Sequence, residues 1–155
     1  MTKTIYILSI KMPSKIYPLT ASEYILRFDG GSRGNPGLGG CGAVIYHNNE
    51  EIWNGYMFVG DNVTNNYAEY SGLILGLKQA LELNIKELIV EGDSLLVINQ
   101  LTNVYKCKSE NLLELNETAK QLAKEFTSIC LRHILRNKNK RADQLANFAV
   151  DHQKT

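Results

Sequence analysis

Apolar and polar residues alternate between positions 24 and 59 in a way that predicts β-strands. The expected strands are Tyr24 to Asp29, Cys41 to His47 and Ile52 to Val59. The last two are separated by Asn48-Asn49-Glu50, a connection typical of a hairpin. Residues 30–42 are rich in glycine and contain Pro36, so we expect a loop without regular structure there.

From residue 65 onward the apolar period changes from two to about 3.6, which predicts a long helix over residues 65–83 with Thr64 or Asn65 as its N-cap. The segments expected after it are a strand (Lys86 to Gly92), a short helix (Ser94 to Val104), an amphipathic helix (about Leu112 to Phe126), a strand (Ser128 to Arg136) and a closing helix (Ala142 to Asp151). The order βββαβααβα predicts an α/β fold, with a mixed five-stranded sheet of three antiparallel strands and two parallel additions, flanked by helices.

The length of 155 residues and the apolar content of 44% fit one globular domain. We expect that domain to span residues 23–155, after an N-terminal extension of uncertain order over residues 1–22. No apolar run reaches the roughly 18 residues of a membrane span. The short run Ile5 to Ile10 is not followed by a small-residue cleavage site, so we expect no signal peptide. A cytoplasmic protein without a membrane partner is therefore expected.

Cysteine spacing and net charge say little about the function. Cys41, Cys107 and Cys130 are odd in number and lack a C-x-x-C pair, so we expect neither a disulfide framework nor a zinc site. The net charge of +1 does not indicate a nucleic-acid partner. The basic stretch Arg132 to Arg141 leaves two interpretations open, a solvated charged turn or a local nucleic-acid contact.

Four acidic residues are expected to converge. Asp29 and Asp93 each follow a predicted strand, Glu69 heads the sheet-facing stripe of the long helix, and Asp143 lies in the first turn of the last helix. Taken singly, each has an ordinary explanation as a turn residue, a helix cap or a partner of the helix dipole. Together they would repel one another unless hard divalent cations neutralised them. Two Mg²⁺ or Mn²⁺ ions about 4 Å apart would suit in-line displacement at a phosphodiester.

The residues around these acids resemble the type 1 ribonuclease H family from Tyr24 to Asp151. Four blocks carry the resemblance in order and spacing: DGGSRGNPG at 29–37, TNNYAE at 64–69, GDS at 92–94 and NKRADQLA at 139–146. One such block would be moderately specific, but four in register make a strong match. The resemblance implies the same fold and an endonuclease that cuts the RNA strand of RNA/DNA hybrids, leaving 3′-hydroxyl and 5′-phosphate ends.

By the same resemblance, the metal-binding and catalytic residues are Asp29, Glu69, Asp93 and Asp143, holding two Mg²⁺ ions with Mn²⁺ as a substitute. The substrate contacts that it implies, with the neighbouring residues of the matched blocks, are Gly30, Gly31, Ser32, Arg33, Asn35, Thr64, Asn65, Asn66 and Asn139. Arg136 and Lys138, in the loop before the last block, are two further candidate contacts. Among all these contacts, the asparagines are expected at the minor groove and Thr64 at a DNA phosphate. Asparagine both donates and accepts hydrogen bonds, which suits the 2′-hydroxyl that distinguishes RNA.

Two departures from the family pattern stand out. Many members carry a histidine in the loop before the last aspartate; this loop has none, and Arg136 or Lys138 is our hypothesis for its replacement. His47, His133 and His152 are expected to be structural or exposed. A basic helical insert found in some members is also absent, which predicts modest, salt-sensitive affinity for the substrate. The pattern is nearest the compact archaeal-like and plant-like branch. For this branch, double-stranded RNA is a second substrate to test. We expect a monomer, and the main alternative function is a non-catalytic hybrid-binding module.

Overall fold

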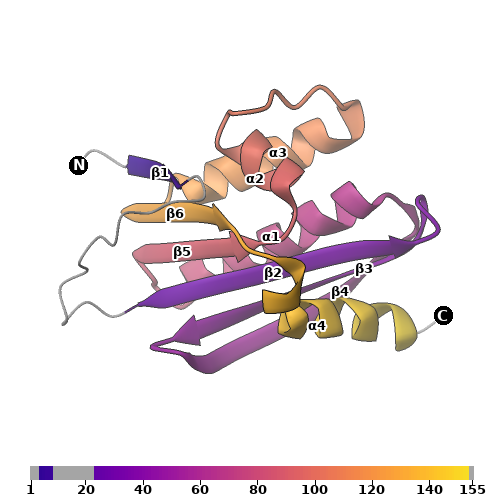
Figure 1. Cartoon of the computed structure of the whole chain (residues 1–155), viewed down its shortest axis with the longest axis horizontal. Helices are drawn as coiled ribbons and strands as arrows, with labels where there is room; N and C mark the ends of the chain where they lie inside the picture. The colour runs from indigo at the N-terminus through magenta and orange to yellow at the C-terminus, as the bar shows by residue number, and fades with distance from the viewer. Residues whose placement is uncertain (1–3, 9–22, 154–155) are drawn as a thin grey trace.

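A six-stranded mixed sheet forms the centre of the molecule in this computed structural model, which describes residues 4–8 and 23–153 (Figure 1). The strand order across the sheet is β1-β6-β5-β2-β3-β4. The strands are β1 (Thr4–Leu8), β2 (Tyr24–Arg33), β3 (Gly37–His47), β4 (Glu50–Val63), β5 (Glu87–Gly92) and β6 (Ser128–His133). β2, β3 and β4 pair antiparallel, whereas β5, β6 and β1 add in parallel beside β2.

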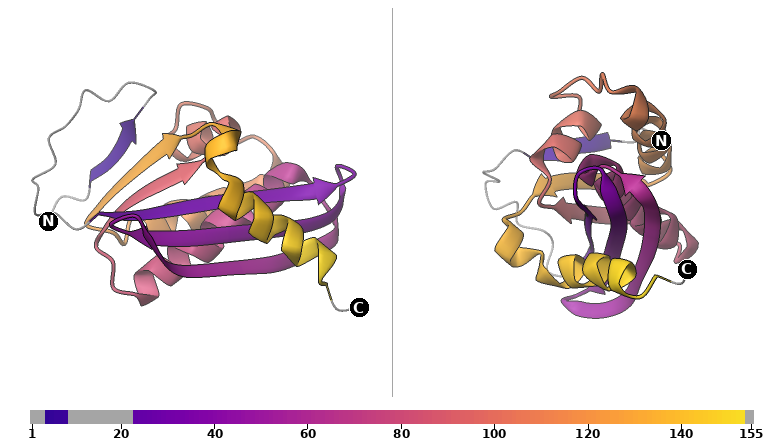
Figure 2. Two further views of the ribbon diagram at one scale, coloured as in Figure 1. Left: turned by 60° about the horizontal axis from the view of Figure 1, so that its bottom comes forward. Right: turned by 90° about the vertical axis from the view of Figure 1, so that its right-hand side faces the viewer.

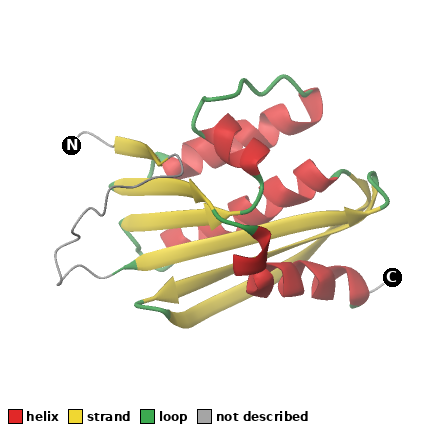
Figure 3. Ribbon diagram, viewed as in Figure 1, coloured by secondary structure: helices red, strands yellow, loops and turns green. Residues whose placement is uncertain are grey.

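Helices cover both faces of this sheet (Figures 2 and 3). They are α1 (Asn65–Glu82), α2 (Leu95–Leu101), α3 (Glu110–Ala123), α4 (Lys140–Asp151) and the short 3₁₀ turn Arg136–Lys138. Glycines mark the contacts on the two faces, because Gly76 of α1 packs on Leu26 of β2, whereas Gly40 and Gly42 of β3 lie against α4. No helix in the described part of the chain has both the length and the apolar character needed to cross a membrane.

The five predicted strands and the α/β fold are confirmed, and the helix bounds agree with the prediction to within a few residues. The strand predicted to run to Arg136 ends at His133 and is followed by the 3₁₀ turn. Part of the predicted N-terminal extension is a sixth strand: β1 pairs in parallel with β6, from Thr4 opposite Ser128 to Leu8 opposite Arg132. The other residues of that extension lie outside the described part of the chain.

The expected loop over residues 30–42 is wrong, because most of it is strand. β2 continues to Arg33 and β3 begins at Gly37, so only a tight turn around Gly34, at a φ of +80°, separates them. Glycine is used here for close packing rather than for a loop. A Cβ atom on Gly30 would lie 2.2 Å from the backbone of Ala68 in α1, and one on Gly42 would lie 2.5 Å from the Cβ of Leu145 in α4.

Pairing along β2 is unequal on its two sides. β5 accompanies β2 only from Ile25 to Phe28, whereas β3 accompanies it along its whole length, from Tyr24 to Arg33. Beyond Phe28 only β2, β3 and β4 continue the sheet, with β2 at its edge, and Asp29 is the first residue of that edge.

The hydrophobic core lies between the sheet and helices α1, α2 and α3. Its largest fully buried side chains include Phe28, Phe126 and Tyr70. The Tyr70 hydroxyl donates to Gln100 Oε1 at 2.7 Å and accepts from Asn116 Nδ2 at 2.9 Å, so a buried hydrogen-bond network joins the three helices. All three cysteines lie in the described part of the chain and none forms a disulfide, as predicted.

Candidate active site

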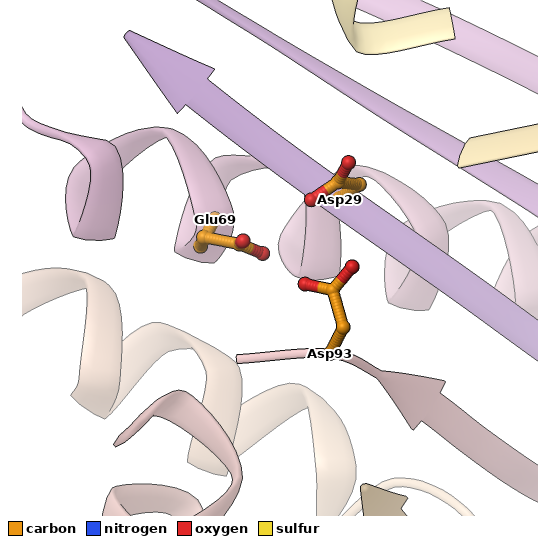
Figure 4. Close-up of side chains that lie close together, drawn as sticks. All are labelled: Asp29, Glu69 and Asp93. Carbon is orange, nitrogen blue, oxygen red and sulfur yellow. The ribbon is translucent and has the colours of Figure 1, made fainter. Parts of the chain in front are cut away.

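Three of the four predicted acids meet where β2, β5 and α1 come together (Figure 4). Asp29 lies on β2, Asp93 directly follows β5, and Glu69 lies in the second turn of α1. One carboxylate oxygen from each lies within 4.8 Å of the other two. The convergence follows from the topology, since β2 and β5 are parallel neighbours and the last pair, Phe28 opposite Gly92, brings Asp29 beside Asp93.

Asp143 joins the group from the opposite wall. It lies in the first turn of α4 and lines the same cleft, of about 500 Å³, as the other three acids. The nearby charge of Asp143 is one of the causes that raise the pKa of Asp29. The cleft has β2 residues 29–33 as its floor, α1 as one wall and α4 as the other.

The electrostatics of the cluster favour a bound cation. Burial, followed by the charge of Asp93, raises the pKa of Asp29 to about 7. Burial, followed by the charges of Asp29 and Asp93, raises the pKa of Glu69 well above its ordinary value. The Glu69 oxygen Oε2 is buried and has no hydrogen-bond partner. A buried carboxylate oxygen without a partner is costly, and a hard divalent cation is the ligand that oxygen donors of this kind prefer.

Polar contacts hold the start of α1 against the turn between β2 and β3. The Asn35 side-chain oxygen accepts from the backbone N–H of Asn65 at 3.0 Å, and the Asn65 side-chain oxygen accepts from the backbone N–H of Ser32 at 2.8 Å. Thr64 is the N-cap, and its hydroxyl accepts from the N–H of Tyr67 at 3.2 Å. These contacts fix the helix that carries Glu69 relative to the strand that carries Asp29.

Asn139 orients Asp93 from below the cleft. Its amide nitrogen donates to the backbone oxygen of Phe28 at 2.8 Å and to Asp93 Oδ2 at 3.4 Å. The Nε2 atom of His133 lies 3.2 Å from the backbone oxygen of Asp93 and supports the same segment. Two residues from the C-terminal part of the chain therefore set the position of one carboxylate.

Comparison with known proteins agrees with this geometry. A family described as reverse transcriptase-like matches residues 27–149. The crystal structure of ribonuclease H1 from the archaeon Halobacterium salinarum is 34% identical with a TM-score of 0.81, covering 84% of this chain and 99% of that one. The chain belongs to the type 1 ribonuclease H family. Another type 1 ribonuclease H, solved in complex with an RNA/DNA hybrid, is 35% identical with a TM-score of 0.77, covering 83% of this chain and 97% of that one.

A longer relative shows that such domains also occur as parts of larger proteins. A bifunctional protein of Mycobacterium tuberculosis is 41% identical over 131 residues, which are 83% of this chain and 36% of that protein. This ribonuclease H chain therefore spans about a third of the length of the mycobacterial relatives that it matches.

The cleft brings together most of the residues predicted for the ribonuclease H site. Besides the four acids, the predicted residues that line it are Gly30, Gly31, Ser32, Arg33, Asn65, Asn66 and Arg136. Asn139 is only 1% exposed and its amide nitrogen donates to Asp93, so its contact with a substrate stays a prediction. Asn35 and Thr64 make the α1 contacts described above, and Lys138 is exposed on the 3₁₀ turn.

Part of the α4 wall of this ribonuclease H domain was not predicted. Ala146, Asn147 and Val150 line the cleft beside Asp143, and Ser94 lines it beside Asp93. The signal for the α4 residues is present in the sequence, because steps of three or four from Asp143 reach each of them on one face of the helix.

Proposed function

We propose that this domain hydrolyses the RNA strand of RNA/DNA hybrids endonucleolytically, with two Mg²⁺ ions or Mn²⁺ in their place, giving 3′-hydroxyl and 5′-phosphate ends. The observation that carries the proposal is the set of three acids with oxygens within 4.8 Å of one another at the base of a cleft. The buried, unpartnered oxygen of Glu69 supports a cation among them.

Asp29, Glu69, Asp93 and Asp143 would hold the cations in this proposal. Divalent cations bound there would polarise the scissile phosphate and lower the pKa of an attacking water. The chain itself supplies position and charge. Burial of Asp29 and Glu69, both less than 10% exposed, keeps bulk water away from the cluster and strengthens its electrostatic interactions.

Substrate recognition would come from the floor and the α1 wall. Asn65 and Asn66 lie at the start of α1 and line the cleft, where an amide side chain both donates to and accepts from a 2′-hydroxyl. No atom lies within 4 Å of the position of a Cβ on Gly31, so a ligand has room to approach the backbone there. Thr64 would contact a DNA phosphate through its hydroxyl proton, because its oxygen already caps the helix.

Arg136 is our proposed replacement for the histidine that many family members carry in the loop before the last aspartate. It lines the cleft from the 3₁₀ turn, and its charge lowers the pKa of Glu69. A guanidinium group does not titrate near neutral pH, so it would bind the scissile phosphate rather than transfer a proton. Lys138, exposed on the same turn, would contribute a second positive charge to the duplex.

Cleavage of end-labelled RNA/DNA, RNA/RNA and DNA/DNA duplexes tests the proposal, with Asp29→Asn beside the wild type. Asn keeps the shape of Asp29 and removes a ligand charge, so we expect kcat to fall by at least about 10³-fold. EDTA should stop turnover of the wild type. Cutting of the hybrid by the variant, or in EDTA, would reject the metal-dependent mechanism.

The other arms separate the remaining possibilities. Cleavage of RNA/RNA would add double-stranded RNA to the substrates, and binding of the hybrid without cleavage would favour the hybrid-binding module. We also propose a cytoplasmic monomer, and one chain is sufficient for the cleft because it supplies all four acids. Light scattering should then give a mass near 17.4 kDa.

A further inference from the structure

Arg33 and Asp151 form an ion pair at the end of the cleft remote from the 3₁₀ turn. Arg33 ends β2 and Asp151 ends α4, and the guanidinium nitrogen lies 2.6 Å from the carboxylate oxygen. Both side chains are about half exposed, at 49% and 51%. Arg33 lines the cleft, so the pair joins the floor of the cleft to its α4 wall.

The two elements run the same distance from the acids to this pair. Four strand residues separate Asp29 from Arg33, about 13 Å at 3.3 Å per residue. Eight helical residues separate Asp143 from Asp151, about 12 Å at 1.5 Å per residue. A nucleic-acid backbone with one phosphate at the acids, followed along β2, would reach Arg33 within about two to four nucleotides.

We propose that Arg33 binds a phosphate of the cleaved strand and that Asp151 competes with that phosphate for the guanidinium group. This inference rests on the proposed function. An exposed ion pair contributes little free energy, about 0–1 kcal/mol, because water screens it. A phosphate accepts two hydrogen bonds from one guanidinium group and replaces the carboxylate readily. Asp151 thereby lowers the affinity for the duplex and holds Arg33 in place while the cleft is empty.

A double-mutant cycle on the full chain tests the proposal, with Asp151→Asn, Arg33→Gln and the double variant. Each protein is assayed for KM and kcat on the hybrid at several salt concentrations, and for hybrid binding by fluorescence anisotropy. We expect Asp151→Asn to lower KM about threefold and Arg33→Gln to raise it about fivefold, with smaller changes in kcat. Arg33→Gln should also reduce the slope of log affinity against log salt by about one, because one phosphate contact is lost.

The double variant decides whether Asp151 acts through Arg33. We expect Asp151→Asn to have no effect on KM once Arg33 is replaced. An equal effect in both backgrounds would overturn the proposal, since it would mean that any lost negative charge improves binding. Glu87→Gln is the matched control, because Glu87 is exposed at the start of β5, at the far end of that strand from Asp93. An unchanged KM and Kd in Arg33→Gln would overturn the proposal as well.

The two readouts separate this inference from the proposed function. Hybrid that is bound but not cut would reject hydrolysis and still leave the Arg33 cycle measurable by anisotropy. Cleavage that is indifferent to Arg33 would keep the hydrolase and reject the ion-pair role. A hybrid that neither binds nor is cut would overturn both.

Discussion

The two walls of the cleft are held in different ways. The α1 wall depends on close backbone packing, with Gly30 against Ala68, and on short hydrogen bonds to the β2–β3 turn. The α4 wall also packs closely on the sheet, with Gly42 against Leu145, but its polar contacts are exposed ion pairs, Arg33 with Asp151 and Arg141 with Glu51. Steric packing does not respond to salt, whereas exposed ion pairs do. We therefore expect the α1 wall to set the catalytic geometry and the α4 wall to tune affinity.

Gly30→Ala should break the α1 wall and have the largest effect on stability. The new Cβ would lie 2.2 Å from the carbonyl group of Ala68, and backbone atoms cannot rotate away from it. We expect a loss of about 3 kcal/mol, which lowers Tm by roughly 6–12 °C, and reduced cleavage because Glu69 follows Ala68. Thermal unfolding measures the loss of stability.

Gly31→Ala is the matched control for stability, because nothing lies within 4 Å of its Cβ position. We expect its Tm to stay within a degree or two of the wild type. Equal losses in the two variants would show that glycine matters here for strand conformation and not for the approach of α1.

Asn139→Ala tests whether the C-terminal part of the chain also sets the catalytic geometry. It removes the amide that donates to Phe28 and Asp93, and loss of such a supporting contact typically costs 10–100-fold in metal affinity or activity. We expect the Mg²⁺ concentration for half-maximal rate to rise by about tenfold. Asn137→Ala, at an exposed position of the 3₁₀ turn just before Asn139, should leave this Mg²⁺ concentration unchanged. A similar rise in that variant would count against the role of Asn139.

The stability of the metal-free protein should depend on pH through Asp29. Its pKa is about 7 in the folded chain against an ordinary 3.8, so the folded state holds an extra proton between these values. Stability is therefore lost as pH rises from about 4 to 7, and Tm should fall over that range. Asp29→Asn should show a smaller loss, because Glu69 still keeps a pKa raised by its burial, and Mg²⁺ should offset the loss in the wild type. Parallel Tm curves for wild type and variant from pH 5 to 8 would contradict the burial effect.

Glu51→Gln should have the smallest effect, because it weakens only the α4 wall. Arg141 donates to both oxygens of Glu51 at 3.0 Å, and the pair ties the first turn of α4 to β4. We expect less than about 1 kcal/mol in stability and a two- to threefold change in KM, with kcat nearly constant. Unfolding in urea measures the change in stability, and steady-state kinetics measure KM and kcat. A tenfold loss of kcat would mean that the pair positions Asp143.

The sequence predicts the order of strands and helices from residue 24 onward and the convergence of the four acids, because hydrophobic period and chain topology determine them. It fails where tertiary packing decides. Gly30 and Gly42 look like loop residues in isolation, and only the nearness of α1 and α4 explains them as strand. Asn139 belongs to a matched block, but its burial depends on the distant Phe28 carbonyl, which no local pattern reveals.

The narrowing of the sheet beyond Phe28 has a dynamic consequence. Only β2, β3 and β4 continue there, and β2 is the edge strand of this ribbon. An edge strand leaves backbone groups unpaired on one side, so the amides of residues 29–33 depend on the two covering helices for protection from hydrogen exchange. The domain is then expected to open locally at Asp29 to Arg33 before it unfolds globally. A bound duplex, which would press this ribbon between α1 and α4, would slow the exchange of those amides while leaving Ile25 to Phe28, protected by strands on both sides, as slow as before.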